Sequence, residues 1–263
     1  MRLWTAESGI RTLRRWIGES DNIVFFGGAG VSTESGIPDF RGAGGLFSNR
    51  NEDTDDGASP ETILSTAYFH LHPDRFYTFY RKHLIFLSAE PNPAHWALAR
   101  LEKAGKLRAI VTQNIDGLHQ KAGSRTVIEL HGSIRRNHCI ACQSAFGVDE
   151  AQSKQDAAGV PRCGCGGVIR PDVVLYGEEL DAQVMKSAMT AISRADMLIV
   201  GGTSLSVYPA AGLVDCYAGH RFVLVNDTAT PYDDRADLRI SDRIGRVFTQ
   251  LKARGSLFSS YLP

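Results

Sequence analysis

Short apolar runs without polar alternation recur along the chain, and glycine or polar residues bound each of them. Such runs, rich in β-branched residues, are typical of strands that are buried on both faces of a sheet. The first is followed directly by the sequence GGAG, which predicts a tight turn after the strand. Five strands are predicted in this way, at residues 22–26, 109–112, 127–130, 197–200 and 222–225.

Segments with helical spacing separate several of the predicted strands. Alternating strands and helices indicate an α/β fold, here with a Rossmann-like parallel sheet. Helices are predicted at 93–104, 181–194 and 206–218. An amphipathic first helix is predicted from apolar residues at the N-terminus that recur at roughly helical spacing, which are Leu3, Ile10, Leu13 and Ile17.

Two segments interrupt this alternation. Residues 47–87 start with a polar loop and become helical and aromatic, whereas residues 132–173 carry a cluster of cysteines. We interpret both as insertions that build a smaller lobe, one helical and one a zinc ribbon. The expected organisation is a single unit over 1–263, with a large lobe at approximately 1–46, 88–131 and 174–263 and a small lobe at approximately 47–87 and 132–173.

Charge and composition narrow the choice of function. Lys plus Arg and Asp plus Glu both number 29, so the formal net charge is zero and a bulk nucleic-acid binder is disfavoured. No apolar run approaches the roughly 18 residues that a membrane helix needs. Four of the 5 cysteines lie close together. This grouping favours a metal site in a reducing cytoplasm over a disulfide framework.

The glycine turn after the first strand, with Gly28 and Gly30, is a candidate phosphate site. Glycines let a backbone approach a pyrophosphate closely, and a following helix would present its N–H groups. A tight turn that binds no ligand is equally compatible with these residues. A dehydrogenase is disfavoured, because Thr33 replaces the third glycine of the usual motif and no acidic strand end follows about twenty residues later.

Longer sequence motifs include this turn and recur further along the chain. Residues 28–41 read GAGVSTESGIPDFR, and residues 112–119 read TQNIDGLH. Residues 129–133 read ELHGS, and further motifs occupy 170–178 and 202–210. This set, in this order, resembles the signatures of the sirtuin family and spans nearly the whole chain.

The resemblance implies an NAD-dependent protein lysine deacetylase. Such enzymes consume NAD, release nicotinamide and transfer the acetyl group of a lysine to ADP-ribose, so acetylated proteins or peptides are the expected partners. His131 is the expected general base, because its free pKa lies near neutrality and it follows a predicted strand at the ligand-binding edge of the sheet. Asn114 is the second expected catalytic residue, and His119 is expected to be structural.

The resemblance also assigns binding residues. The expected contacts to NAD are Ala29, Thr33, Phe40, Arg41, Gln113, Asn114, Ile115, Asp116, His131, Thr203, Ser204, Asn226 and Ile244. The substrate peptide is expected to pair with Val174, Leu175 and Tyr176 as an added strand.

The cysteines form two pairs, Cys139 with Cys142 and Cys163 with Cys165. Four thiolates make a closed tetrahedral zinc site, so one structural zinc is expected. The second pair has one intervening residue where the family more often has two, and Gly164 makes the tighter loop feasible. Free thiols or a redox pair are the alternatives.

The sequence also bears on the acyl group of the substrate and on alternative functions. Sirtuins that remove acidic acyl groups carry a Tyr-x-x-Arg pair, but here Tyr80 is followed by Arg81, Lys82 and His83, which favours acetyl or another neutral acyl group. The alternatives are a mono-ADP-ribosyltransferase, a non-enzymatic zinc-knuckle binding module and an NAD oxidoreductase. We expect a cytoplasmic monomer that binds neither membranes nor nucleic acid directly.

Overall fold

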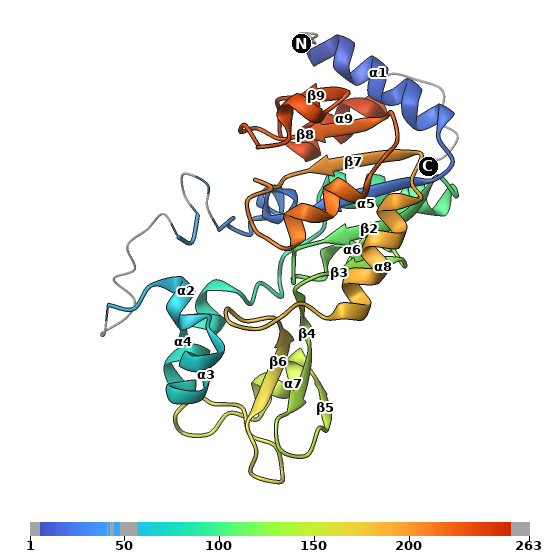
Figure 1. The fold of residues 1–263 in the computed structure, drawn as a ribbon. Helices are drawn as coiled ribbons and strands as arrows, with labels where there is room; N and C mark the ends of the chain where they lie inside the picture. The colour runs from blue at the N-terminus through green and yellow to red at the C-terminus, as the bar shows by residue number, and fades with distance from the viewer. Residues whose placement is uncertain (1–5, 41, 43–44, 48–56, 254–263) are drawn as a thin grey trace.

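The computed structural model describes residues 6–40, 42, 45–47 and 57–253 (Figure 1). Among the predicted features, Leu3 of the first helix, the cofactor residue Arg41 and almost all of the polar loop at 48–57 lie outside the described residues.

A six-stranded parallel sheet forms the larger body. Its order is β3-β2-β1-β7-β8-β9, and every neighbouring pair is parallel. The five predicted strands are confirmed as members of this sheet. The bounds are Ile23–Gly27 (β1), Leu107–Thr112 (β2), Val127–Glu129 (β3), Met197–Gly201 (β7), Phe222–Val225 (β8) and Leu238–Ile240 (β9).

Helices cover both faces of this sheet, which explains why its strands are apolar without alternation. One face packs against α1 (Ala6–Glu19), α5 (Pro93–Lys103) and α9 (Ile244–Ala253). The other packs against α8 (Ala182–Ser193) and the 3₁₀ helix η3 (Ala210–Cys216), in the segment where a helix was predicted. Phe25 faces the first of these cores and Val24 the second.

A second body lies below the large sheet in Figure 1. It combines the helices α2 (Pro60–Ile63), α3 (Thr66–Leu71) and α4 (Pro73–His83) with a three-stranded antiparallel sheet of order β5-β4-β6. These strands are Gly132–Cys139 (β4), Ala145–Gly147 (β5) and Ile169–Val173 (β6), and α7 spans Val148–Ser153. Its core joins aromatic residues of α3 and α4 to Ile134 and Val173 of the sheet.

Short elements connect the strands at the edge where the site lies. The 3₁₀ helices η1 (Ala29–Val31) and η2 (Thr33–Ser35) follow β1, and α6 (Leu118–Lys121) follows β2. A further 3₁₀ helix, η4 (Asp233–Arg235), precedes β9. Within the described residues, no helix combines the length and the apolar character needed to cross a bilayer.

Candidate active site and metal centre

The expected site residues converge because the strands are parallel. Strand order runs outward from β1 to β3 on one side and from β7 to β9 on the other. The switch point of the sheet therefore lies between β1 and β7, and ligands of open α/β sheets bind beyond the carboxyl ends of the strands at this point. The segments that follow β1, β2, β3, β7 and β8 all reach this edge.

Two glycine turns pack against each other at the switch point. The N–H of Gly30 donates to the carbonyl of Gly202 over 2.8 Å. A Cβ on Gly30 would lie 2.8 Å from the Cα of Gly202, and one on Gly28 would lie 2.7 Å from the Cβ of Thr203. These glycines are thus required by the contact between the turns, which places Thr203 beside the turn after β1.

A polar cluster, consisting of buried Ser32 and partly buried Asn114 and Asp116, lies next to these turns. The Ser32 hydroxyl donates to Asp116 Oδ2 over 2.6 Å and accepts from Asn114 Nδ2 over 3.1 Å. Asn114 Nδ2 also donates to the carbonyl of Gly28 over 3.0 Å. Ser32 is 1% exposed and joins the other two side chains. Ser32 was not predicted from the sequence as a site residue, because a serine in a turn has many ordinary uses.

Burial shapes the acid–base properties of Asp116. It raises the pKa of the carboxyl group, although hydrogen bonds from the Ser32 hydroxyl and the Leu118 N–H oppose this shift. Each carboxylate oxygen accepts one of these bonds and retains acceptor capacity. The arrangement can therefore hold a ligand group that donates hydrogen bonds, such as an amide.

His131 has the protonation pattern of a general base. Its Nδ1 lies 2.9 Å from the carbonyl oxygen of Gln113. Since a carbonyl only accepts, Nδ1 carries the proton and the neutral ring keeps a lone pair on Nε2. Burial lowers the pKa of His131 against the opposing effect of the Gln113 bond, which favours the neutral form.

Gln113 links this histidine to the far side of the switch point. Its backbone carbonyl holds His131, and its side-chain Nε2 donates to the Thr203 hydroxyl over 3.0 Å. Residues after β2, β3 and β7 are therefore connected by hydrogen bonds.

The expected peptide residues, 174–176, form what we call the peptide segment. The Val174 N–H donates to the carbonyl of His131 over 3.0 Å, so this segment adjoins the candidate base. The Tyr176 ring, 42% exposed, lies 6.5 Å from the ring of Phe47, which lies 5.4 Å from Phe40. Aromatic rings thus form a row from Phe40, in the segment after η2, to the peptide segment.

The remaining expected NAD contacts differ in their environments. Ala29 and Thr33 begin the 3₁₀ helices after β1, and the Thr33 hydroxyl donates to the carbonyl of Gly30. Ile115 packs against the core of the second body. Ile244 is 1% exposed and fills the space beside Gly201.

Two further residues lie beyond the end of the strands on the β7–β8 side. Asn226 is buried, and its Nδ2 donates to the carbonyl of Thr228 over 2.9 Å. Ser204 is exposed and lies 2.7 Å from the Ser206 hydroxyl oxygen.

Asn92 and His95 are buried polar residues that were not selected from the sequence, whereas His119, also buried, was expected to be structural. Asn92 Nδ2 donates to the Val31 carbonyl over 2.7 Å and to the Ser35 hydroxyl over 3.0 Å, which anchors the turn after β1. The rings of His95 and His119 are 4.7 Å apart. Burial lowers the pKa of His119 to about 3 and that of His95 to about 4, so both rings are neutral at physiological pH. Both environments are those of interior residues.

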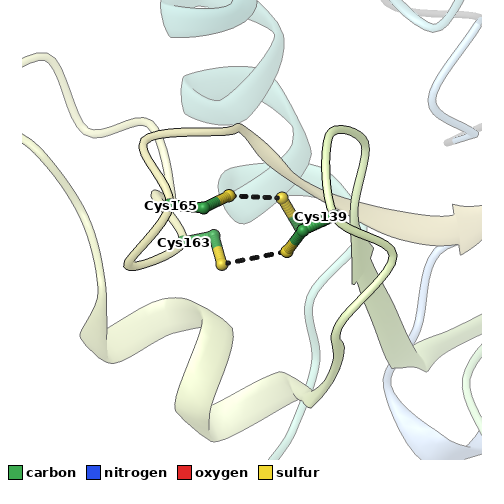
Figure 2. Close-up of side chains that lie close together, drawn as sticks. Cys139, Cys163 and Cys165 are labelled. Carbon is green, nitrogen blue, oxygen red and sulfur yellow. Dashed lines mark hydrogen bonds between the residues drawn. The ribbon is translucent and has the colours of Figure 1, made fainter.

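The four cysteines expected to bind metal come together (Figure 2). Their sulfur atoms all lie within 4.8 Å of one another, with Cys139 to Cys165 at 3.5 Å and Cys142 to Cys163 at 3.6 Å. Tetrahedral zinc with bonds of about 2.3 Å places its sulfurs about 3.8 Å apart. A Cβ on Gly167 would lie 2.6 Å from Cys139 Sγ, so a glycine is needed beside the cluster.

The electrostatics of the cluster also fit a cation. Hydrogen bonds from Ser144 are the main cause that lowers the pKa of Cys142 to about 6. The Gly167 N–H lowers the pKa of Cys165, but the neighbouring sulfurs outweigh it and raise the pKa to about 12. Four thiolates at these distances therefore need a positive charge between them. The residues fit a closed four-thiolate zinc site.

Comparisons with known proteins show what the chain is similar to. A model of the Sir2 family matches residues 28–209. Proteins named NAD-dependent protein deacetylase are 54% identical over 240 residues in Clostridium perfringens and 52% identical over 239 residues in Clostridium acetobutylicum. Each alignment covers 90% of this chain and 96% of the relative.

Solved structures show the same fold. A Sir2 complex with a p53 peptide and NAD+ is 37% identical with a TM-score of 0.81, and covers 92% of this chain and 97% of that one. A Sir2 variant with deacetylated p53 peptide and 3'-O-acetyl ADP-ribose is 36% identical with a TM-score of 0.84, and covers 94% and 98%. The matched family model spans well over half of the sequence, and the chain belongs to the Sir2 family.

Proposed function

We propose that the chain is an NAD-dependent protein lysine deacetylase that releases nicotinamide and transfers the acetyl group to ADP-ribose. The observation that carries this proposal is that His131, in a Sir2 chain, keeps a lone pair on Nε2 at the same sheet edge as the polar cluster. A base and a polar cluster at a switch point suit a reaction that breaks one bond of NAD and forms another to the substrate.

His131 acts as the general base in this proposal. The acyl oxygen of the substrate lysine bonds to the ribose carbon as the bond to nicotinamide breaks. The neutral Nε2 of His131 then takes the proton from a ribose hydroxyl, which attacks the acyl carbon, and water completes the release of the lysine amine and acetyl-ADP-ribose. The bond from Nδ1 to Gln113 fixes the tautomer and orients the ring, and it stabilises the imidazolium that forms. Asn114 contributes by orienting the groups that react.

The polar cluster holds the nicotinamide end of NAD. The carboxamide of nicotinamide donates N–H bonds, and Asp116 has acceptor capacity in a buried setting. Ser32 keeps this carboxylate in position. The remaining contacts along NAD are proposed for Ala29, Thr33, Phe40, Arg41, Gln113, Ile115, Thr203, Ser204, Asn226 and Ile244.

The substrate is an acetylated protein or peptide that lies along the peptide segment. For the acyl group we propose acetyl or another neutral group. The Arg81 guanidinium donates to the Gly159 carbonyl over 2.6 Å, so it already has a partner within the chain. Tyr77 and Tyr80 are buried in the core of the second body.

The zinc and the two bodies have supporting roles. Zinc bound by the four cysteines would hold the turn after β4 to the loop before β6, and it would take no part in the chemistry. We propose that the two bodies are the lobes expected from the sequence and that the site lies where they adjoin. A cytoplasmic location is also proposed, because the cluster needs reduced thiols.

A product analysis tests the function. The purified protein, incubated with NAD and an acetyl-lysine peptide, should yield free nicotinamide, deacetylated peptide and acetyl-ADP-ribose by mass spectrometry. A side chain that carries ADP-ribose while the lysine keeps its acetyl group would support a mono-ADP-ribosyltransferase instead.

A further inference from the structure

The peptide segment is bound to two different parts of the chain through its backbone. The Val174 N–H donates to the carbonyl of His131 over 3.0 Å. The Tyr176 N–H donates to the carbonyl of Leu64 over 2.9 Å, and the Tyr176 carbonyl accepts from the Thr66 N–H over 3.0 Å. The segment therefore connects His131, between β3 and β4, to the junction between α2 and α3.

A tight turn closes the end of this segment. The Glu178 N–H donates to the Leu175 carbonyl over 3.0 Å, while Glu178 Oε2 accepts from the Leu175 N–H over 2.9 Å. Gly177, at the third position of the turn, has a φ of 90°, which a type II turn requires. Both backbone polar groups of Leu175 are thus bound by one residue, Glu178.

Arg170, on β6, holds the carboxylate of Glu178. Its Nη2 lies 2.6 Å from Glu178 Oε2 and also donates to the Val173 carbonyl over 3.2 Å. The Arg170 and Glu178 side chains are 17% and 22% exposed, and the guanidinium carbon lies 5.6 Å from the centre of the Phe69 ring. Hydrogen bonds between opposite charges are stronger than neutral ones, and this pair is largely removed from screening water.

We propose that Arg170 and Glu178 are positioning residues that hold the peptide segment in the conformation that receives the acyl-lysine peptide. This proposal rests on the proposed function and adds residues that do not touch the substrate. The pair acts through the backbone of Leu175, whose two polar groups it immobilises, and so through the adjoining Val174.

Val174 offers the group that such positioning would serve. No residue described in the structure donates to its carbonyl oxygen, whereas the other backbone N–H and C=O groups of the peptide segment are bound. A carbonyl on a fixed backbone can accept an N–H from an acyl-lysine substrate, which is how added peptides gain affinity. Its direction depends on the turn that Glu178 closes.

Two substitutions of graded severity test the proposal. Glu178→Gln keeps an oxygen for the Leu175 N–H and removes the charge, whereas Glu178→Ala removes both. We expect the peptide KM to rise about 3-fold in the first and about 10-fold in the second, since a charged hydrogen-bond partner is lost from a largely buried pair. The KM for NAD should change by about twofold at most. Glu179→Gln, at the exposed neighbouring position, is the matched control and should change neither value.

Peptide binding without chemistry provides the second readout. Fluorescence anisotropy of a labelled acetyl-lysine peptide should weaken in the same order as the kinetics, while the melting temperature stays near that of the wild type. Unchanged peptide affinity in both variants overturns the proposal, even where the wild type deacetylates normally. Equal losses in peptide affinity, NAD affinity and melting temperature also overturn it, because they show a general role in folding.

Two milder variants keep the test decisive if the most severe variant does not fold. If Glu178→Ala does not fold, Glu178→Gln and Arg170→Lys decide the outcome, since each keeps part of the pair. A wild-type protein that consumes no NAD would refute the proposed function instead, and the anisotropy comparison would still judge the pair.

Discussion

Replacing Ser32 with alanine removes one hydroxyl from the centre of the polar cluster. The hydroxyl donates to Asp116 Oδ2 over 2.6 Å and accepts from Asn114 Nδ2 over 3.1 Å. Asn114 keeps its bond to the Gly28 carbonyl, but Asp116 Oδ2 loses the donor that holds it. The carboxylate is therefore the group that the substitution affects most.

The expected size follows from burial. Ser32 is 1% exposed, so water does not readily take the place of the hydroxyl. A buried acceptor left without its partner costs about 1–3 kcal/mol. That cost corresponds to about a 5- to 150-fold change in an affinity or a rate ratio. We expect kcat/KM for NAD to fall by a factor in this range in Ser32→Ala.

The same substitution changes the pH dependence. Burial raises the pKa of Asp116, and the Ser32 hydrogen bond opposes that shift. Without the hydroxyl the pKa rises further, so the carboxylate takes up a proton at a higher pH. The acid limb of kcat/KM for NAD should therefore move to higher pH in the variant.

Steady-state kinetics at saturating peptide measure both effects, with circular dichroism to check folding. Ser35→Ala is the control, because the Ser35 hydroxyl lies in the same turn but contacts Asn92, outside the cluster. It should change kcat/KM about twofold or less. Wild-type kcat/KM and an unshifted acid limb in Ser32→Ala would refute the reasoning.

Three further predictions concern ionisable and metal-binding groups. Burial holds the pKa of Asp116 above 3.8, so ionising this carboxyl group costs folding stability as pH rises through the raised pKa. Asp116→Asn should therefore keep or raise the melting temperature at pH 7 while the turnover of NAD falls. A lower melting temperature with full turnover would contradict this prediction. Burial lowers the pKa of His131 from 6.5, and the reaction requires the neutral form of this histidine. The acid limb of the wild-type pH–rate profile that reports His131 should therefore have its midpoint below pH 6.5. A midpoint above pH 6.5 would contradict the assignment of His131 as the base. Elemental analysis should find about one zinc per chain. Cys139→Ser should lose this zinc and have a lower melting temperature, whereas the control Cys216→Ser should retain the zinc. Active, well-folded protein without zinc would contradict a structural role for the metal.

Much of the large sheet could be predicted from apolar runs, because helices cover both of its faces. The exception is β9, where Arg239 separates Leu238 from Ile240 and leaves too short a run to detect. The zinc-ribbon insertion was predicted, but the individual strands of its antiparallel sheet were not. Its longest strand, β4, contains Arg135, Arg136 and other polar residues, because part of it is exposed.

The functional site could likewise be predicted where the signal is local in the sequence, and not where it depends on tertiary packing. Cysteine spacing is a local signal, so the grouping of the four metal ligands was predictable. Ser32 was missed because its partners lie 82 and 84 residues away in sequence. Hydrogen bonds over such separations become visible only once the strands are placed. Ile244, selected from a loose match at the C-terminus, lies in the core beside Gly201.

The central claim is that His131 removes a proton after nicotinamide has left, so that the acetyl group passes to ADP-ribose. The most direct measurement compares wild type and His131→Ala in a single turnover with NAD and an acetyl-lysine peptide, followed by mass spectrometry. Wild type should form one acetyl-ADP-ribose for each nicotinamide released. The variant should still exchange labelled nicotinamide into NAD but form acetyl-ADP-ribose about 100- to 10,000-fold more slowly. Wild-type rates of acetyl-ADP-ribose formation in His131→Ala, or nicotinamide release without that product in wild type, would contradict the account.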